Sequence, residues 1–192
     1  TYGGNTFVGG GTLTAATNGA FGSSIMIKLG VDTNGVATGS NAILNINTAG
    51  IIVTNAITVL GSATNTIENT SGNTVTYSGA VALSNNATVA NVNTNAGSAT
   101  GNTILSGVVS GSGVLTVNPG SGTVTLVSAN TYSNGTVLNG GTLAVSNNAA
   151  LGTGSLTVAT NATLQAVTSV TLGRTRMASS KASHQREAEA SA

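Results

Sequence analysis

Short runs in which apolar and polar residues alternate recur along the chain, and clusters of Gly, Asn and Ser separate them. The alternation is plain in Leu44-Asn45-Ile46-Asn47, Val75-Thr76-Tyr77 and Val124-Thr125-Leu126. Apolar side chains at every second position place one face of a strand inward and the other outward. No stretch before residue 174 shows a 3.6-residue period long enough for a helix. The pattern therefore predicts an all-β protein of short strands.

The predicted strands share a richness in Val, Ile, Leu and Thr. They are Thr6–Thr14, Ser24–Leu29, Ala42–Ile46, Ile51–Leu60, Asn65–Glu68, Thr74–Tyr77, Ala80–Leu83, Thr88–Val92, Thr103–Val109, Val114–Val117, Thr123–Val127, Thr136–Val145, Ser155–Val158, Ala162–Ala166 and Ser169–Leu172.

The residues between these runs are suited to sharp corners. Asn34-Gly35, Asn134-Gly135 and Asn139-Gly140-Gly141 combine the two residue types that adopt the left-handed backbone conformation most readily. Asn-Gly also favours two-residue hairpins. Two arrangements therefore stay open at this point, a parallel β-helix and an antiparallel β-sandwich.

A long internal repeat favours the first arrangement. Thr1–Gly22 and Thr131–Gly152 align without gaps and are identical at ten of 22 positions, among them Gly10/Gly140, Gly11/Gly141 and Leu13/Leu143. Such a repeat indicates one structural unit stacked on others like it. We expect a right-handed parallel β-helix of about eight coils with roughly 22 residues in each, which makes a rod about 40 Å long.

Composition supports a narrow core and divides the chain in two. Charged residues make up 5%, aromatics 3% and hydrophobic residues 40%, and there is no Cys. The net charge of +1 gives no basis for nucleic-acid binding, and no apolar run reaches membrane-spanning length.

Residues 1–173 form the repetitive domain. The composition changes at Gly173, and the polar, charged tail of residues 174–192 is expected to be a linker, a short helix or a non-native end.

An ordered series of motifs lies between residues 106 and 152, where the copy is clearest. It comprises Gly111-Ser112-Gly113-Val114-Leu115, Gly120-Ser121-Gly122-Thr123-Val124-Thr125-Leu126, Asn130-Thr131-Tyr132, Gly140-Gly141-Thr142-Leu143 and Ala149-Ala150-Leu151-Gly152. This series resembles the autotransporter-associated β-strand repeat, which occurs in the passenger regions of bacterial type V secreted proteins. Asn118 and Val124 depart from the usual pattern, and Thr1–Gly22 is similar to the end of an earlier copy.

The resemblance implies a β-helical passenger that is exported through the outer membrane of a Gram-negative bacterium to the cell surface. It also implies a C-terminal translocator β-barrel in the full-length protein, which this chain does not include. The repeat itself generally forms stalk, and catalytic domains in such proteins are usually inserted elsewhere. The absence of a starting Met or signal peptide is expected of an internal piece.

Titratable residues are too few for catalysis. Outside the tail the chain has one Lys (Lys28), one Asp (Asp32) and one Glu (Glu68). Glycoside or pectate chemistry would need clustered carboxylates. Asp32-Thr33-Asn34-Gly35 begins like a calcium loop but lacks the acidic residue at position 12, so a plain turn is predicted. His184, with Ser183 and Glu187 nearby, lies in the tail. We therefore predict no enzyme activity and no catalytic, cofactor or metal site.

Two other residue types are candidate surface features. Thr-x-Thr pairs occur at Thr12/Thr14, Thr64/Thr66, Thr74/Thr76 and Thr123/Thr125, and stacked pairs would make an ice-binding face. Their spacing is not coil-regular, so outward-facing Thr on a solvated sheet is the simpler interpretation. Tyr2, Tyr77 and Tyr132 would suit glycan contact. However, Tyr2 and Tyr132 occupy one repeated position, which favours packing at a coil corner.

The sequence as a whole predicts a structural stalk segment of a surface-displayed or secreted passenger that supports adhesion or cell aggregation. The alternatives are a fragment of a β-helical polysaccharide-acting enzyme and an ice-binding solenoid. Expected partners are host-surface glycans or proteins, or identical passengers on other cells.

Overall fold

The computed structural model describes residues 3–23, 25–92, 101–167, 169–172 and 177–179, and these form three parallel β-sheets with no helix. Sheet 1 contains, in spatial order, β1 (Thr6–Val8), β3 (Met26–Leu29), β6 (Ala56–Val59), β9 (Val81–Leu83) and β12 (Val109–Gly111). Sheet 2 contains β2 (Gly11–Ala15), β4 (Ala42–Ile46), β7 (Asn65–Asn69), β10 (Ala87–Asn91), β13 (Leu115–Asn118), β15 (Thr136–Leu138), β17 (Leu156–Val158) and β19 (Met177–Ser179). Sheet 3 contains β5 (Ile52–Val53), β8 (Thr74–Tyr77), β11 (Asn102–Leu105), β14 (Thr123–Leu126), β16 (Gly141–Val145) and β18 (Ala162–Ala166).

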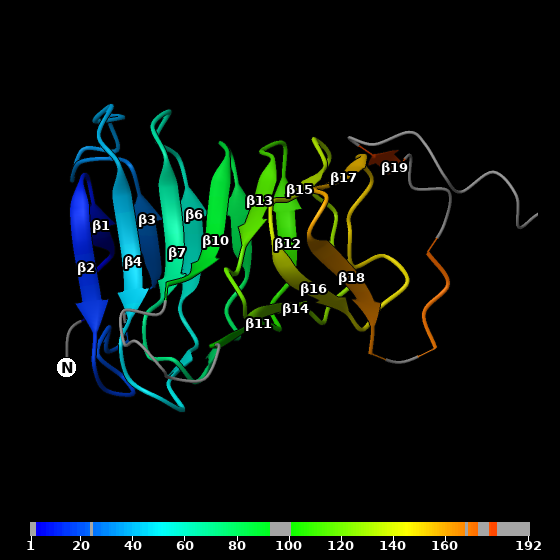
Figure 1. Cartoon of the computed structure of the whole chain (residues 1–192). Helices are drawn as coiled ribbons and strands as arrows, with labels where there is room; N and C mark the ends of the chain where they lie inside the picture. The colour runs from blue at the N-terminus through cyan, green and yellow to red at the C-terminus, as the bar shows by residue number, and fades with distance from the viewer. Residues whose placement is uncertain (1–2, 24, 93–100, 168, 173–176, 180–192) are drawn as a thin grey trace, which may run out of the picture.

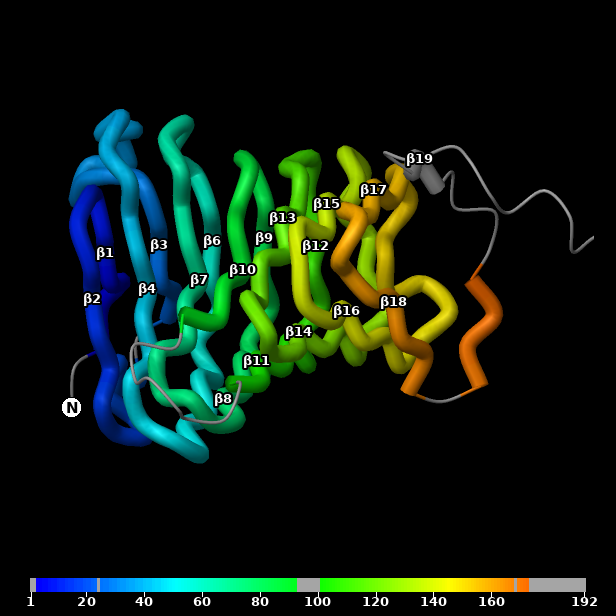
Figure 2. Tube along the Cα trace, in the orientation of Figure 1, coloured from blue at the N-terminus to red at the C-terminus, as the bar shows by residue number. Residues whose placement is uncertain are grey.

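From β3 to β14 the chain visits the three sheets in turn, and each strand pairs with the strand of the same sheet one coil later. Among the described residues, no sheet 3 strand lies between β2 and β3, and β15 to β19 alternate between sheets 2 and 3. Figures 1 and 2 show the result, a stack of coils along one axis with the N-terminal coil at one end. Seven of the eight strands of sheet 2 lie within residues 1–173, where about eight coils were expected, and the eighth, β19, lies in the tail. Strand spacing of about 4.8 Å sets the rise from coil to coil. The expected parallel β-helix is therefore the fold of this protein.

The antiparallel sandwich is wrong for this chain. Every strand pairing among the described residues is parallel, and the one antiparallel contact is an isolated bridge between Val31 and Ala37 inside a long corner. The Asn-Gly pairs form corners and loops, since none of them joins two antiparallel strands.

The coils differ in length, so the expected coil size is an average and not a fixed repeat length. In sheet 2, Gly11 pairs with Ala42 and Ala42 pairs with Asn65, so the first of these coils is clearly the longer. In sheet 3, Thr123 pairs with Thr142, which makes a coil shorter than either. The extra residues sit in corners, which tolerate insertions because each doubling of a loop costs only about 0.6 kcal/mol.

A continuous apolar column fills the rod from coil to coil. In sheet 2 the inward side chains stack in register along the axis, and they are Leu13, Leu44, Ile67, Val89, Val117, Leu138 and Val158. The inner five are fully buried, and the two end residues are partly buried against the same core. Small aliphatic side chains suffice because the space between three sheets is narrow.

The strand predictions were mostly confirmed, with two kinds of error. Thr6–Thr14, Ile51–Leu60 and Thr136–Val145 each prove to be two strands on either side of a corner, and Thr103–Val109 likewise spans β11 and the start of β12. Corner residues such as Gly9-Gly10 and Asn139-Gly140 do interrupt these runs, but the apolar residues on both sides were joined into one strand.

Ser169–Leu172 is not a strand, although Val170 and Leu172 do pack on the core. Thr171 N donates to Asn148 Oδ1 at 2.8 Å, so a side chain replaces the backbone ladder there. In the tail, Met177–Ser179 pairs in parallel with β17, so these three residues are neither helix nor structureless linker. The other residues of 174–192 lie outside the described part of the chain.

The two copies of the sequence repeat occupy different corners of the rod. In the first copy, β1 belongs to sheet 1 and β2 to sheet 2. In the second copy, the matching strands β15 and β16 belong to sheets 2 and 3. The pattern of strands, bends and turns is nevertheless the same over residues 6–20 and 136–150. The repeat therefore encodes a corner with its two flanking strands, not a whole coil.

Candidate functional site

Asp32 stabilises a turn. Its Oδ1 accepts hydrogen bonds from the backbone N–H groups of Asn34 and Val36, each at 2.9 Å, and Gly35 N donates to Asp32 O at 3.0 Å. Two backbone donors on one carboxylate oxygen make an Asx-type turn. The predicted plain turn is thus what the structure shows at this position.

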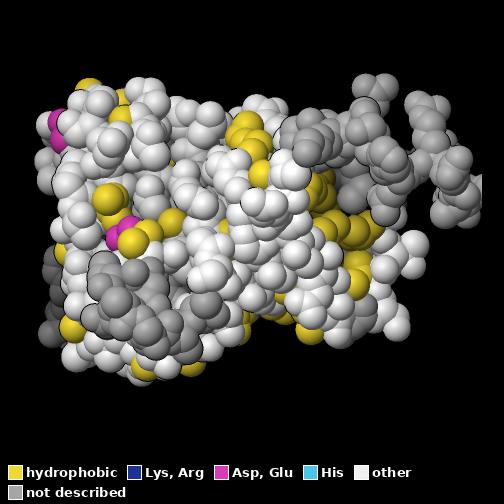
Figure 3. All heavy atoms as spheres, in the orientation of Figure 1, with side chains coloured by type: hydrophobic (Ala, Val, Ile, Leu, Met, Phe, Trp, Pro, Cys, Tyr) yellow, Lys and Arg dark blue, Asp and Glu magenta, His cyan; other side chains and the backbone are white. Residues whose placement is uncertain are grey.

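Glu68 lies on β7 of sheet 2, away from Asp32 in the sequence and in the fold. Partial burial raises the pKa of its carboxyl above the ordinary value. No group of three or more His, Cys, Asp or Glu gathers in the described residues, and the acidic side chains visible in Figure 3 form two separate patches. Lys28 places its ammonium 5.4 Å from the centre of the Phe7 ring, a cation–π contact. His184, Ser183 and Glu187 lie outside the described residues.

Tyr77 and Tyr132 are packing residues, as the corner interpretation predicted for Tyr132. Both are fully buried. Tyr77 donates its hydroxyl proton to Glu68 O at 3.2 Å, and the Tyr132 hydroxyl lies 2.6 Å from Thr136 Oγ1. Burial raises the pKa of both phenols, to about 12 for Tyr132. Tyr2 lies outside the described residues.

The Thr-x-Thr pairs do not assemble into one face. Thr12 and Thr14 lie on β2 of sheet 2, whereas Thr74/Thr76 and Thr123/Thr125 lie on β8 and β14 of sheet 3. The latter two pairs are separated by β11, which carries Asn102 and Ile104 at the matching positions. A continuous two-column array of Thr is therefore absent from the described part of sheet 3.

Buried Asn side chains link the coils at the corner between sheets 2 and 3. Asn69 and Asn91 are register partners on β7 and β10. Asn69 Nδ2 donates to Asn102 O at 3.0 Å, and Asn91 Nδ2 donates to Thr123 O at 3.0 Å, in each case reaching the next coil. The buried Thr103 hydroxyl is satisfied by Asn91 Oδ1. The sequence suggested Asn at corners, but not that the amides would be buried and bridge coils.

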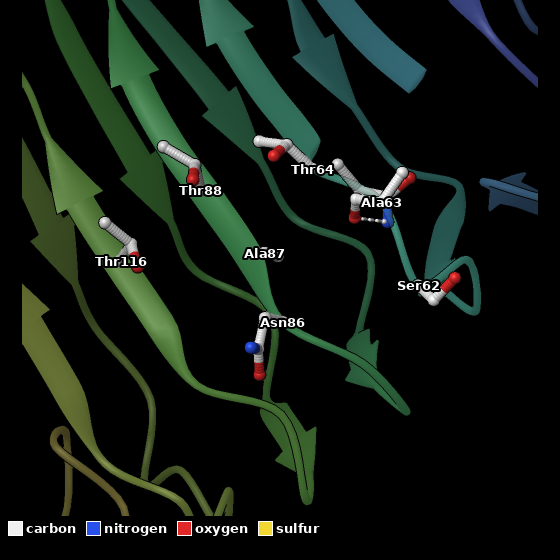
Figure 4. A pocket seen from close by; sticks show the side chains of 8 residues that line it. Ser62, Ala63, Thr64, Asn86, Ala87, Thr88 and Thr116 are labelled. Carbon is white, nitrogen blue, oxygen red and sulfur yellow. Dashed lines mark hydrogen bonds between the residues drawn. The ribbon is translucent and has the colours of Figure 1, made fainter. Parts of the chain in front are cut away.

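A groove of about 230 Å³ lies on the outside of sheet 2 and crosses three coils. Its lining residues carry no charge, and they are Ser62, Ala63, Thr64, Asn65, Asn86, Ala87, Thr88 and Thr116. Figure 4 shows Thr88 and Thr116 on neighbouring strands, with Asn86 just before β10 and Thr64 on the coil beyond. Thr66, Thr88 and Thr116 are register partners, so one hydroxyl per coil follows the rod axis.

Several polar groups of this groove make no hydrogen bond within the described residues. The hydroxyls of Thr64, Thr88 and Thr116 make no hydrogen bond within the described residues. Asn86 Oδ1 accepts from Val114 N at 2.9 Å, which fixes the side chain and leaves its Nδ2 without a partner in the described chain. The sequence did not reveal this groove, because the Thr residues that the register brings into one column are unevenly spaced along the chain.

A larger hollow of about 380 Å³, lined by Asn91, Val92, Gly101 and the corner of residues 118–122, lies where the chain enters residues 93–100, which are outside the described part. We therefore take the sheet 2 groove as the candidate site.

Comparison with family models, with curated proteins and with solved structures gave no match to this chain. In the described parts of the chain, no helix offers the length and apolar character that crossing a membrane requires.

Proposed function

We propose that this chain is a stalk segment of a surface-displayed bacterial passenger, which holds a binding region away from the cell and supports adhesion or aggregation. The observation that carries the proposal is the continuous stack of coils with one apolar core along its length. Each coil rests on its neighbours, so added coils lengthen the rod without a new kind of contact.

The chemistry of the surface supports a spacer role in preference to a catalytic one. The face in Figure 3 consists mainly of uncharged polar side chains and backbone, with apolar patches that are largest toward the C-terminal end of the rod. The acidic groups of the described residues are Asp32, which holds a turn, and Glu68, which stands alone on its strand. General acid–base chemistry on a sugar requires two positioned carboxyl groups. The resemblance to the autotransporter-associated repeat is a second, independent support.

The experiment displays the full chain on a Gram-negative bacterium, between an N-terminal epitope and a C-terminal translocator. The matched control replaces the chain with a Gly/Ser linker of equal residue number, which behaves as a flexible coil. We expect the epitope to be accessible on intact cells in both. On the rod it should sit at one height of about 40 Å, whereas the linker should give a broad distribution with an r.m.s. span of roughly 70–80 Å. Small-angle scattering of the purified chain should give the distance distribution of a rod.

A compact scattering profile, or an epitope whose distance from the membrane varies as broadly as with the linker, would contradict the stalk proposal. Release of reducing sugars from a polysaccharide by the purified chain would favour the enzymatic alternative. Inhibition of ice recrystallisation would favour the ice-binding one.

A further inference from the structure

We propose that the groove on sheet 2 binds a neutral polysaccharide chain that lies along the rod axis. This goes beyond a stalk role, because it assigns a ligand to the repetitive segment itself. The site is built from Thr64, Asn86, Thr88 and Thr116. This proposal depends on the groove alone, and not on the domains to which the rod is attached.

The first argument is the spacing of the polar groups. Thr88 and Thr116 are direct register partners on β10 and β13. On the preceding coil the groove is lined by Thr64, two residues before Thr66, which is the register partner of Thr88 on β7. Hydroxyls on adjacent parallel strands therefore recur about every 4.8 Å along the axis. One sugar unit of an extended glycan advances by roughly the same distance as one coil, so successive units meet equivalent hydroxyls.

The second argument is the chemistry of the lining. A Thr hydroxyl both donates and accepts, and the Asn86 amide nitrogen donates, which matches sugar hydroxyls that do both. The hydroxyls of Thr64, Thr88 and Thr116 and the Nδ2 of Asn86 make no hydrogen bond within the described residues, although Asn86 Oδ1 accepts from Val114 N. A ligand that hydrogen-bonds to these groups replaces their water partners by equivalent ones. An apolar ligand would displace the water and leave the groups without hydrogen-bond partners.

The third argument is charge, which narrows the class of ligand. No lining residue is charged, so the groove lacks the Lys or Arg that a phosphate or nucleic acid requires. Glu68 stands on the same sheet, two residues beyond Thr66 on β7, and its charge disfavours uronic acids and sulfated sugars. A neutral glycan is the class that remains.

The groove has no aromatic residue among its lining, so binding rests on hydrogen bonds alone. Each such bond contributes modestly in water, so a single groove binds weakly. Many rods on one cell would raise the effective affinity, because the second binding event becomes intramolecular. Millimolar affinity for a short oligosaccharide is therefore the expected range.

The test titrates the full chain with cellohexaose and with maltohexaose, and records backbone amide NMR shifts. A hexamer of galacturonic acid serves as the anionic control. We expect at least one neutral hexamer to shift the amides of Thr64, Asn86, Thr88 and Thr116, and the anionic hexamer to leave them in place. The double variant Thr88→Val, Thr116→Val keeps the β-branched shape and removes both hydroxyls, and should weaken binding about 10-fold.

The matched variant is Thr125→Val on β14 of sheet 3, which is also outward, half-buried and without a hydrogen bond within the described residues. It should bind the hexamer as the parent chain does. Absence of shifts with either neutral hexamer at millimolar concentration overturns the proposal. Equal loss from Thr125→Val, or stronger binding of the anionic hexamer, also overturns it. The stalk proposal would survive any of these results, since it depends on the scattering profile and the reach of the epitope.

Discussion

The two copies of the repeat have the same local structure and different surroundings. Residues 6–20 and 136–150 share their sequence of strands, bends and turns. The first copy lies at the end of the rod, where β1 pairs with β3 alone and β2 with β4 alone among the described strands. In the second copy, β15 lies between β13 and β17, and β16 lies between β14 and β18. The comparison therefore separates what the repeat encodes locally from what stacking adds.

Stacking changes burial more than conformation. Leu13 is partly buried, whereas its counterpart Leu143 is fully buried. Ala20 is exposed and Ala150 is fully buried. Because the corner keeps its form at the exposed end, we infer that local turn chemistry is enough to set it. Most of the packing energy then comes from the neighbouring coils.

The largest difference between the copies should follow removal of the repeated Leu. Leu143→Ala creates a cavity between two covered coils, and buried Leu→Ala substitutions cost about 2–5 kcal/mol. Leu13→Ala should cost about half as much, since that side chain already meets solvent. Urea unfolding monitored by circular dichroism measures both. Equal losses would show that the end coil is as well packed as an internal one, contrary to the difference in burial.

The repeated Gly provides a sharper test, because the two sites share a backbone conformation. Gly11 and Gly141 have φ of +73° and +59°, so Ala at either site incurs the left-handed penalty of about 1–2 kcal/mol. A Cβ on Gly11 meets nothing within 4 Å, whereas one on Gly141 would lie 2.4 Å from Gly120 O and 2.7 Å from Pro119 Cγ.

We expect Gly11→Ala to show the conformational penalty alone, and Gly141→Ala to lose roughly 1–3 kcal/mol more through overpacking. Denaturant unfolding of the two variants, each against the parent chain, gives the difference. If the two losses are equal within the error of the measurement, the backbone of Gly120 must move freely, and the covered corner is less constrained than its contacts indicate.

The stability of the chain at alkaline pH tests how well the corner around Tyr132 in the second copy is shielded from water. Burial raises the pKa of Tyr132 from 10.0 to about 12, so the folded chain retains a proton that the unfolded chain releases above pH 10. Stability is complete below that pH and falls as the pH approaches about 12. Tyr132→Phe should remove part of this dependence, leaving the part due to Tyr77, and should lose about 1–2 kcal/mol near neutral pH because Thr136 loses its partner.

Thermal unfolding at about pH 9 and about pH 11, with tyrosinate absorbance followed in parallel, measures this dependence. A parent chain whose tyrosines all ionise near pH 10 while it stays folded would show that the corner is open to water.

The sequence predicted the strands well, because alternation is a local property. The parallel stacking was inferred from the internal repeat, since alternation and Gly/Asn corners left an antiparallel arrangement open. Asn65–Asn69 and Thr74–Tyr77 were expected nearly to the residue. Corners inside Thr6–Thr14 and Thr136–Val145 were missed because the short apolar runs on either side of Gly9-Gly10 and Asn139-Gly140 were joined into one strand. Ser169–Leu172 was wrongly made a strand, since an Asn side chain satisfies Thr171 N there.

The groove was beyond prediction for a different reason. It depends on which residues of successive coils become neighbours, and that depends on corner lengths that absorb insertions. Thr66, Thr88 and Thr116 are unevenly spaced along the chain, so no fixed period connects them. Only the register of β7, β10 and β13 places them in one column. A surface that needs several coils is therefore visible in the structure and hidden in the sequence.

The smallest effect is expected at the repeated Asn, where the two copies should behave alike. Asn18 Oδ1 accepts from Ile52 N at 2.9 Å, and Asn148 Oδ1 accepts from Thr171 N at 2.8 Å, so each amide caps the backbone of a following coil. Both bonds are exposed, and water replaces them in part when the side chain is removed. Asn18→Ala and Asn148→Ala should each lose about 0.5–1 kcal/mol.

Amide hydrogen exchange separates these two variants more clearly than global unfolding does, because a lost cap opens one site and not the whole rod. Exchange at Ile52 should rise in Asn18→Ala and exchange at Thr171 in Asn148→Ala, with neither affected by Asn34→Ala, whose side chain makes no hydrogen bond within the described residues. Because burial differs so much between the copies, equal effects here would establish that the Asn cap belongs to the repeat itself. A loss of amide protection confined to Asn148→Ala would instead show that the cap depends on stacking. The conformation of the end copy would then be set by something other than its own sequence.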